Sequence, residues 1–114
     1  MATISTDRGV VTLINVFTVQ PEHQQELVDV LVEATDKVMR ALPGYVSANI
    51  HRSLDGTRVV NYAQWESQAA FHAMLRNPAA WPHMEAATRL GPADPVLYEV
   101  VHCDERAALT ASAA

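Results

Sequence analysis

The sequence has little of what several classes of protein require. Cysteine is limited to Cys103, which excludes an intramolecular disulfide and a zinc site built from several thiolates. The 8 Lys and Arg residues form no cluster and are outnumbered by 13 Asp and Glu, so a nucleic-acid surface is not expected. No apolar run approaches the roughly 20 residues of a membrane helix, and residues 1–10 lack the apolar stretch of a signal peptide. We therefore expect a soluble, cytoplasmic protein.

Common cofactor and nucleophile motifs are also missing. Neither GxGxxG nor GxxxxGKS/T occurs, and no Ser or Cys lies in a nucleophile elbow. The 5 histidines show no metal-ligand spacing. The sequence therefore supports no organic cofactor, no metal site and no hydrolytic triad.

The composition is that of one folded domain. The 114 residues are 49% hydrophobic and 18% charged, which is enough apolar material for a core. We expect a flexible N-terminus over residues 1–9, a domain over residues 10–103 and a tail over residues 104–114. The Ala-rich tail is compatible with a helix, with disorder or with contact to a partner.

Strand and helix patterns alternate along the chain. Apolar spacing predicts a helix that has Pro21 in its first turn and stops at Pro43-Gly44, a second helix from near Glu66 to Asn77-Pro78, and a further helical stretch over Ala79–Leu90. Trp81 and Met84 are expected to pack in the core. Runs rich in β-branched residues predict four strands: Val10–Val19, Tyr45–Ser53, Thr57–Trp65 and Val96–His102. The order βαββαβ predicts an α+β, ferredoxin-like antiparallel sheet with helices on one face.

The first predicted strand is apolar on both faces. Leu13 and Phe17 lie on one face, and Ile14 and Val16 lie on the other. The third strand likewise carries Val60 and Tyr62 on the face opposite Val59 and Ala63. Helices cover only one face of such a sheet, and an exposed apolar face indicates a protein interface. We expect a homodimer, with Tyr62 at the interface.

Polar residues interrupt the strands at two positions. Asn15 shares a face with Leu13 and Phe17, and Asn61 shares a face with Trp65. Asparagine is a poor strand former and a buried amide needs partners, so the pair indicates either a bulge or a pocket. Trp65 fits either a core or a pocket in which its N–H meets a ligand oxygen.

Other candidates depend on geometry that the sequence leaves open. A two-residue turn at Asp55-Gly56 pairs residues whose numbers sum to 111, so His51 lies opposite Val60 and on the sheet face away from Asn61. A three-residue loop with a bulge would instead place His51 on the same face as Asn61. His83 fits a surface residue, a pocket acid–base or an axial ligand. Arg89 fits either an anion contact or a helix-end charge.

The run NYAQWES at Asn61–Ser67, preceded by SLDGT and followed by Phe71, resembles the antibiotic biosynthesis monooxygenase family. Within it, the chain is similar to the small anthrone monooxygenases of the actinorhodin and nogalamycin types, over roughly residues 10–101. The resemblance implies a dimeric α/β barrel with one pocket per subunit. It also implies oxidation of an anthrone-type aromatic polyketide intermediate to the quinone by O2, without flavin, metal or haem.

The resemblance also implies roles for individual residues. Asn61 and Trp65 match the pocket pair of the family, Asn15 matches an asparagine of the nogalamycin type, and His51 matches a pocket histidine of the actinorhodin type. Phe71 replaces a tyrosine that is proposed to bind substrate, so that contact is missing. The family's arginine in the last helix has no clear counterpart, and Arg89 or His83 is the candidate substitute.

The expected catalytic residues are therefore Asn61, Trp65 and Asn15, which stabilise a substrate enolate that passes one electron to O2; His51, Phe71, His83 and Arg89 are expected to bind substrate. Three alternatives stay open. One is a haem-binding or haem-degrading relative that uses Asn15, Trp65 and His83. The second is a polyketide-binding protein or cyclase that takes up no oxygen, and the third is a small quinol or aldehyde-signal monooxygenase.

Overall fold

The computed structural model describes residues 1–106 of the chain. Its helices and strands are β1 (Val11–Thr18), α1 (Gln24–Lys37), β2 (Tyr45–Arg52), β3 (Arg58–Trp65), α2 (Gln68–Leu75), α3 (Trp81–Leu90) and β4 (Ala93–Tyr98). Single 3₁₀ turns precede α1, follow α1 and precede α3. The predicted tail lies mostly in residues 107–114, which are outside the described residues. No helix in the described part of the chain has the length and apolar character that a membrane crossing requires.

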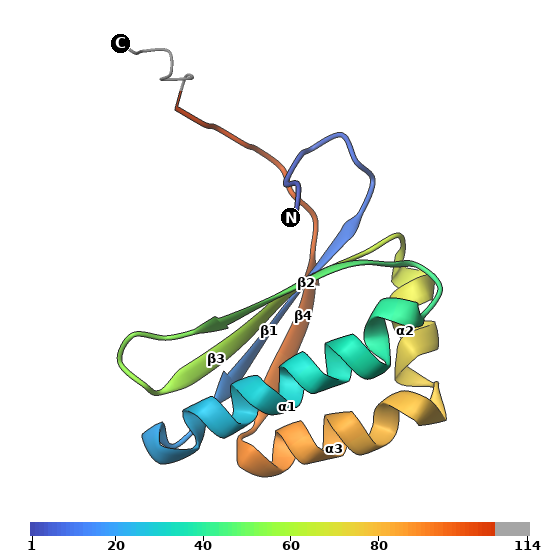
Figure 1. Ribbon diagram of the computed structural model, residues 1–114. Helices are drawn as coiled ribbons and strands as arrows, with labels where there is room; N and C mark the ends of the chain where they lie inside the picture. The colour runs from blue at the N-terminus through green and yellow to red at the C-terminus, as the bar shows by residue number, and fades with distance from the viewer. Residues whose placement is uncertain (107–114) are drawn as a thin grey trace.

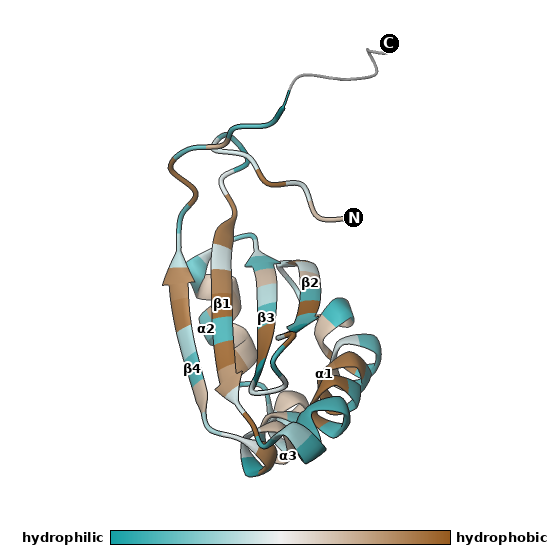
Figure 2. Cartoon of the chain, turned by 90° about the vertical axis from the view of Figure 1, so that its left-hand side faces the viewer, coloured by the Kyte–Doolittle hydropathy of each residue, from teal (hydrophilic) through white to brown (hydrophobic). Residues whose placement is uncertain are grey.

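The strands form one antiparallel sheet in the order β2-β3-β1-β4. Figure 1 shows α1, α2 and α3 on one side of this sheet, and Figure 2 shows the strands side by side with β4 at one edge. The predicted ferredoxin-like α+β fold is confirmed. Its central strands β1 and β3 carry Asn15 and Asn61, so both amides lie in the middle of the sheet.

Capping residues set the helix boundaries. The Ser67 hydroxyl oxygen accepts a hydrogen bond from the Ala70 amide at 3.0 Å, so α2 begins at Gln68 rather than near Glu66. The Asn77 side chain accepts from the Ala79 amide at 2.9 Å and starts the turn that leads into α3. The first helix ends earlier than predicted, at Lys37, and a 3₁₀ turn fills the space before Pro43.

The last strand was predicted at Val96–His102, and this range is wrong. The pairing of β4 with β1 runs from Ala93, opposite Phe17, to Tyr98, opposite Thr12. Because β1 begins at Val11, residues beyond Tyr98 extend past the end of their partner strand. Pro95 is tolerated inside β4 because an edge strand has one side without ladder bonds.

The core fills the space between the sheet and the helices. Leu27 and Val59 are fully buried at one end, and Trp65 and Phe71 are buried at the other. The expectation that Trp81 belongs to the core is wrong. Its side chain is 52% exposed, and its indole N–H donates to the Leu75 carbonyl at 3.0 Å, which fixes the ring at the end of α2 instead.

The other face of the sheet carries no helix (Figure 1). The N-terminal residues reach one end of it, where the fully buried Gln64 amide donates to the Thr3 carbonyl at 2.8 Å. We call this side of the sheet the outer face. Its apolar side chains come from β1, β3 and β4 and are Ile14, Val16, Val60, Tyr62, Val96 and Tyr98, whereas β2 contributes the polar Ser47, Asn49 and His51.

Candidate active site

A cavity of about 190 Å³ lies between the inner face of the sheet and the three helices. A single water needs only roughly 10–15 Å³ of such space, so the cavity is large enough for an organic ligand. Most of its wall is apolar and comes from leucine, methionine, alanine and aromatic side chains. Leu75, Thr88 and Pro95 are lining residues that remain exposed, so the opening lies between α2, α3 and β4.

Asn15 and Asn61 form a polar pair on the sheet wall of this cavity. They are direct cross-strand partners on β1 and β3, and both side chains line the cavity. Their side-chain carbonyl oxygens are buried and have no hydrogen-bond partner among the described residues. An unsatisfied buried polar atom costs about 1–3 kcal/mol, so the fold carries a penalty that a ligand can relieve.

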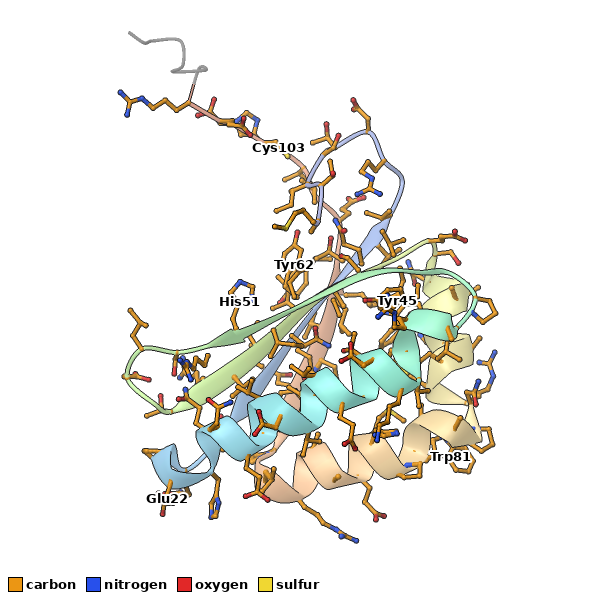
Figure 3. All side chains as sticks on the ribbon, in the orientation of Figure 1. Glu22, Tyr45, His51, Tyr62, Trp81 and Cys103 are labelled. Atoms are coloured by element: carbon orange, nitrogen blue, oxygen red, sulfur yellow. The ribbon has the colours of Figure 1, made fainter. Side chains whose placement is uncertain are left out.

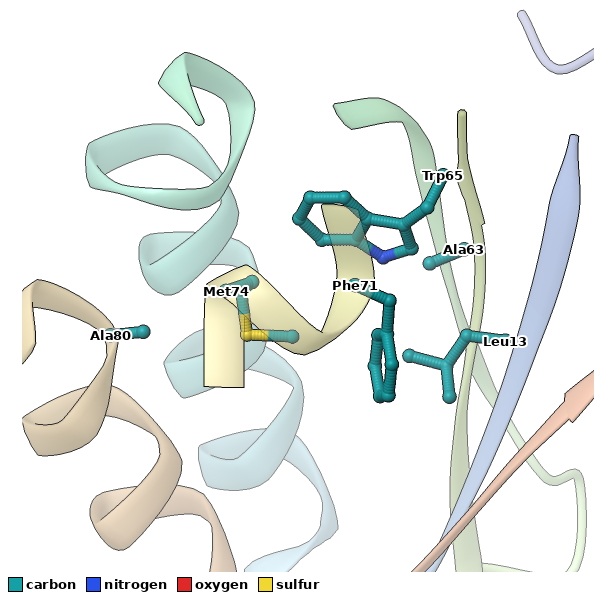
Figure 4. Close-up of a cluster of buried hydrophobic side chains, with 6 residues drawn as sticks. All are labelled: Leu13, Ala63, Trp65, Phe71, Met74 and Ala80. Atoms are coloured by element: carbon teal, nitrogen blue, oxygen red, sulfur yellow. The ribbon is translucent and has the colours of Figure 1, made fainter. Parts of the chain in front are cut away.

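Trp65 adds a third unpartnered polar atom at the end of β3. The side chain is 2% exposed, and its indole nitrogen is buried without an acceptor among the described residues. The ring packs edge-on against Tyr45, at a centroid distance of 5.9 Å, and against Phe71, at 6.4 Å. Figure 4 shows the indole nitrogen on the edge of the ring that faces Phe71. These contacts hold the indole N–H in one orientation.

Tyr45 is a cavity residue that the sequence analysis did not identify. Gly44 precedes it with a positive φ of 85°, and a bulge between Tyr45 and Ser47 shifts the register so that Tyr45 pairs with Trp65. Figure 3 shows Tyr45 on the helix side of the sheet, and it lines the cavity. Burial raises the pKa of the phenol above its usual value, so the hydroxyl stays protonated at neutral pH. The Pro-Gly-Tyr sequence is the signal that could have indicated it.

Phe71 and His83 line the cavity from the helix side. Phe71 is 6% exposed and supplies apolar surface. His83, on α3, is half-buried. Five of the seven predicted site residues therefore meet in one cavity: Asn15, Asn61, Trp65, Phe71 and His83.

His51 and Arg89 do not reach this cavity, and their expected place in the substrate pocket is corrected. The strand pairing places His51 opposite Val60 and Ile50 opposite Asn61, which is the two-residue-turn alternative. His51 is therefore exposed on the outer side of the sheet, where Figure 3 shows it projecting away from the helices. Arg89 is exposed on α3 and forms an ion pair with Glu85 at 2.8 Å.

The cavity wall carries neither a carboxylate nor a permanent cation among the described residues. Within the same part of the chain, no group of three or more His, Cys, Asp or Glu side chains is arranged to hold a metal ion. A free indole N–H donor and two free amide oxygen acceptors in a mostly apolar cavity are suited to an aromatic ligand with oxygen atoms along one edge. The N–H groups of these side chains also stabilise negative charge that develops on a ligand oxygen, because dipoles act strongly where water is excluded.

Comparisons with known proteins agree with this arrangement. The chain is 48% identical over 102 residues to tetracenomycin-F1 monooxygenase from Streptomyces glaucescens, which covers 90% of this chain and 91% of that protein. A monooxygenase from the ActVA-Orf6 gene of Streptomyces coelicolor, solved with nanaomycin D, has a TM-score of 0.79 at 32% identity, over 88% of this chain and 95% of that one. SnoaB, a cofactor-independent oxygenase from Streptomyces nogalater, has a TM-score of 0.74 at 26% identity, over 83% of this chain and 96% of that one.

The family profile described as antibiotic biosynthesis monooxygenase matches residues 10–89, which include β1, β3 and the three polar residues of the sheet wall. All lining residues of the cavity except Ala93 and Pro95 thus lie within the matched region, and the chain belongs to the antibiotic biosynthesis monooxygenase family.

Proposed function

We propose that the protein is a cofactor-independent monooxygenase that oxidises an anthrone-type aromatic polyketide intermediate to the quinone with O2. One observation carries this proposal: three side chains with an unpartnered polar atom, Asn15, Asn61 and Trp65, converge on a cavity whose wall is mostly apolar. Relatives described as a tetracenomycin-F1 monooxygenase and as a cofactor-independent oxygenase support the reaction class.

The chemistry requires an electron-rich substrate anion. Ground-state O2 is a triplet, so a direct two-electron reaction with a closed-shell molecule is spin-forbidden. Loss of a proton from the methylene carbon of an anthrone gives an aromatic enolate, which donates one electron to O2. The two radicals combine to a peroxide, and loss of water from it gives the quinone. Anthrone and O2 are thereby converted into quinone and water.

The sheet wall supplies the stabilisation that this step needs. The Trp65 N–H and the amide NH₂ groups of Asn15 and Asn61 donate hydrogen bonds to the enolate oxygen, while the amide oxygens accept from a neighbouring phenol. Each such bond is worth about 1–3 kcal/mol where the alternative is an unsatisfied buried group. Phe71 and the methionines hold the rings in place and exclude water.

A homodimer is the second part of this proposal. The outer face exposes apolar side chains from β1, β3 and β4, including Val96 at 40% and Tyr98 at 47% exposure. A second copy of the chain buries this face and leaves each cavity, on the opposite side of the sheet, within its own subunit.

Oxygen uptake with a model anthrone tests the function directly. The rate is measured on chelator-treated protein, corrected for autoxidation, beside Asn61→Ala and Trp65→Phe. We expect enzyme-dependent uptake with formation of the quinone, and a loss of about tenfold or more in each variant, because each removes a donor to the anion. Gln20→Ala truncates an exposed amide outside the cavity and serves as the matched control.

Two results contradict the proposal. Uptake no faster than the blank, with tight binding of the aromatic compound, favours a binding protein or a cyclase. A Soret band on addition of haemin that His83→Ala abolishes favours the haem alternative, since Asn15, Trp65 and His83 all line the cavity.

A further inference from the structure

The proposed reaction needs a group that accepts a proton, and the donors on the sheet wall cannot serve. Amide and indole nitrogens are not bases near neutral pH, so Asn15, Asn61 and Trp65 stabilise the enolate without forming it. The proton on the substrate methylene carbon must leave by another route. A base for this proton must therefore be sought among the remaining polar residues of the cavity wall.

Three of those residues are unsuitable as bases because their hydroxyl groups already donate hydrogen bonds or stay protonated. The Thr35 hydroxyl donates to the Leu31 carbonyl at 2.9 Å, and the Thr88 hydroxyl donates to the Met84 carbonyl at 3.1 Å. The Tyr45 phenol is protonated, and burial raises its pKa further. His83 is then the one imidazole among the described residues that line the cavity, because His51 lies on the other side of the sheet.

The position of His83 matches the shape of an anthrone. The carbonyl carbon and the methylene carbon lie at opposite ends of the central ring. The oxygen-binding side chains lie on β1 and β3, whereas His83 lies on α3 in the helix layer. A ring whose oxygen contacts the sheet wall therefore turns its methylene carbon toward the helix wall. His83 is also only half-buried, so its imidazole keeps some contact with solvent and its proton can pass to water.

We propose that His83 is the catalytic base that removes the methylene proton, an inference that rests on the proposed function. The C–H bond breaks, its electron pair becomes part of the enolate, and the proton moves to the free imidazole nitrogen. The enolate passes one electron to O2, the two radicals combine to a peroxide anion, and the imidazolium returns its proton to this peroxide. The second C–H bond at the same carbon then breaks together with the O–O bond: the C–H electron pair forms the carbonyl, and the released proton leaves with the departing hydroxide as water. One water is released, and the histidine is neutral again.

Charged groups near α3 do not compete for this role. Glu85 and Arg89 on the same helix pair with each other, and the charged side chains of α1 and α2 are exposed and point away from the cavity wall: Glu26, Asp29, Glu33, Asp36, Lys37 and His72. The 3₁₀ turn before α3, Pro78–Ala80, carries no charged residue, and from the sheet the cavity receives only neutral side chains.

The experiment compares His83→Gln and His83→Ala with the wild type over a range of anthrone concentrations that reaches saturation. We expect kcat to fall about 100-fold or more while KM changes little, because general base catalysis contributes about 10²–10⁴-fold. With substrate deuterated at the methylene carbon, the kinetic isotope effect should rise in both variants, and added imidazole should restore part of the rate of His83→Ala. His23→Ala removes an exposed histidine of the turn before α1 and is the matched control.

The outcomes separate this inference from the function itself. A wild-type rate at the autoxidation level overturns both. Wild-type activity with unchanged kcat and unchanged isotope effect in both variants overturns only the role of His83 and assigns the proton to water. His83→Gln keeps a side chain of similar size, and thermal denaturation of both variants shows whether a lost rate reflects lost folding.

Discussion

At the scale of the residue, the polar side chains of the cavity wall lower the stability of the fold and are available to bind a ligand. Asn15 lies in the central strand of the sheet between Leu13 and Phe17, which are 5% and 3% exposed, yet its carbonyl oxygen has no partner among the described residues. An apolar residue of similar size would fit the same wall without this penalty. An unsatisfied buried amide in such a position is typical of a functional site rather than of a core.

Asn15→Leu should therefore raise stability and lower activity. Removing an unsatisfied buried oxygen is expected to raise the free energy of unfolding by about 1 kcal/mol, while oxygenase kcat falls because one donor to the enolate is lost. Urea denaturation and oxygen uptake on the same preparation test this. A variant that is less stable than the wild type would indicate that the amide makes structural bonds, and the trade-off would then be rejected.

At the scale of the element, the β2–β3 hairpin depends on one carboxylate. Asp55 accepts hydrogen bonds from the Thr57 amide, the Thr57 hydroxyl and the Ser53 hydroxyl. These bonds, those from Thr57 first, lower the pKa of Asp55 from 3.8 to about 2. The turn also fixes the register that sends His51 to the outer side of the sheet and Asn61 to the cavity.

Asp55→Ala should lower Tm by a few degrees at pH 6, and the difference should disappear in acid. A carboxylate whose pKa is lowered in the folded state stabilises the protein above its ordinary pKa of 3.8 and loses this effect as the pH falls through about 2. Thermal unfolding of the wild type and the variant from pH 6 to pH 2 measures the difference in Tm. Glu99→Ala, at an exposed carboxylate beyond β4, is the control, and an equal gap at every pH would contradict the explanation.

At the scale of the whole molecule, the two faces of the sheet have different roles. The inner face contributes the polar wall of the cavity, and the outer face presents apolar side chains without a covering layer in the single chain. Figure 2 shows β1 as largely hydrophobic along its length, although only one of its faces is covered by helices. This asymmetry is the basis of the proposed homodimer.

Val96→Lys should convert a dimer into a monomer. Val96 is 40% exposed in the single chain, so lysine can be accommodated there, but a charge buried between two sheets is costly. Light scattering after gel filtration should give twice the chain mass of 12.5 kDa for the wild type and the single mass for the variant. Val32→Lys, at an equally exposed valine of α1, should stay dimeric; a monomeric wild type would refute the dimer.

The sequence by itself determined the order and type of the elements and the polar positions of the sheet. Alternation along β1 places Asn15 on the face of Leu13 and Phe17, and alternation along β3 places Asn61 on the face of Trp65, because strand side chains repeat every two residues. That these two faces are the same one depends on the register in which Asn15 pairs with Asn61. Hairpin and helix-stop signals likewise lie in a few neighbouring residues, so local chemistry was enough to predict βαββαβ.

Only the tertiary structure decided which residues meet. The face on which His51 lies depends on turn register, Tyr45 enters the cavity through a bulge, and the length of β4 depends on where β1 begins. His83 reaches the cavity, while Trp81, two residues earlier on the same helix, does not line it, because the packing of α3 against α1 sets the rotation of the helix. These outcomes depend on contacts between segments far apart in the chain, which no local pattern encodes.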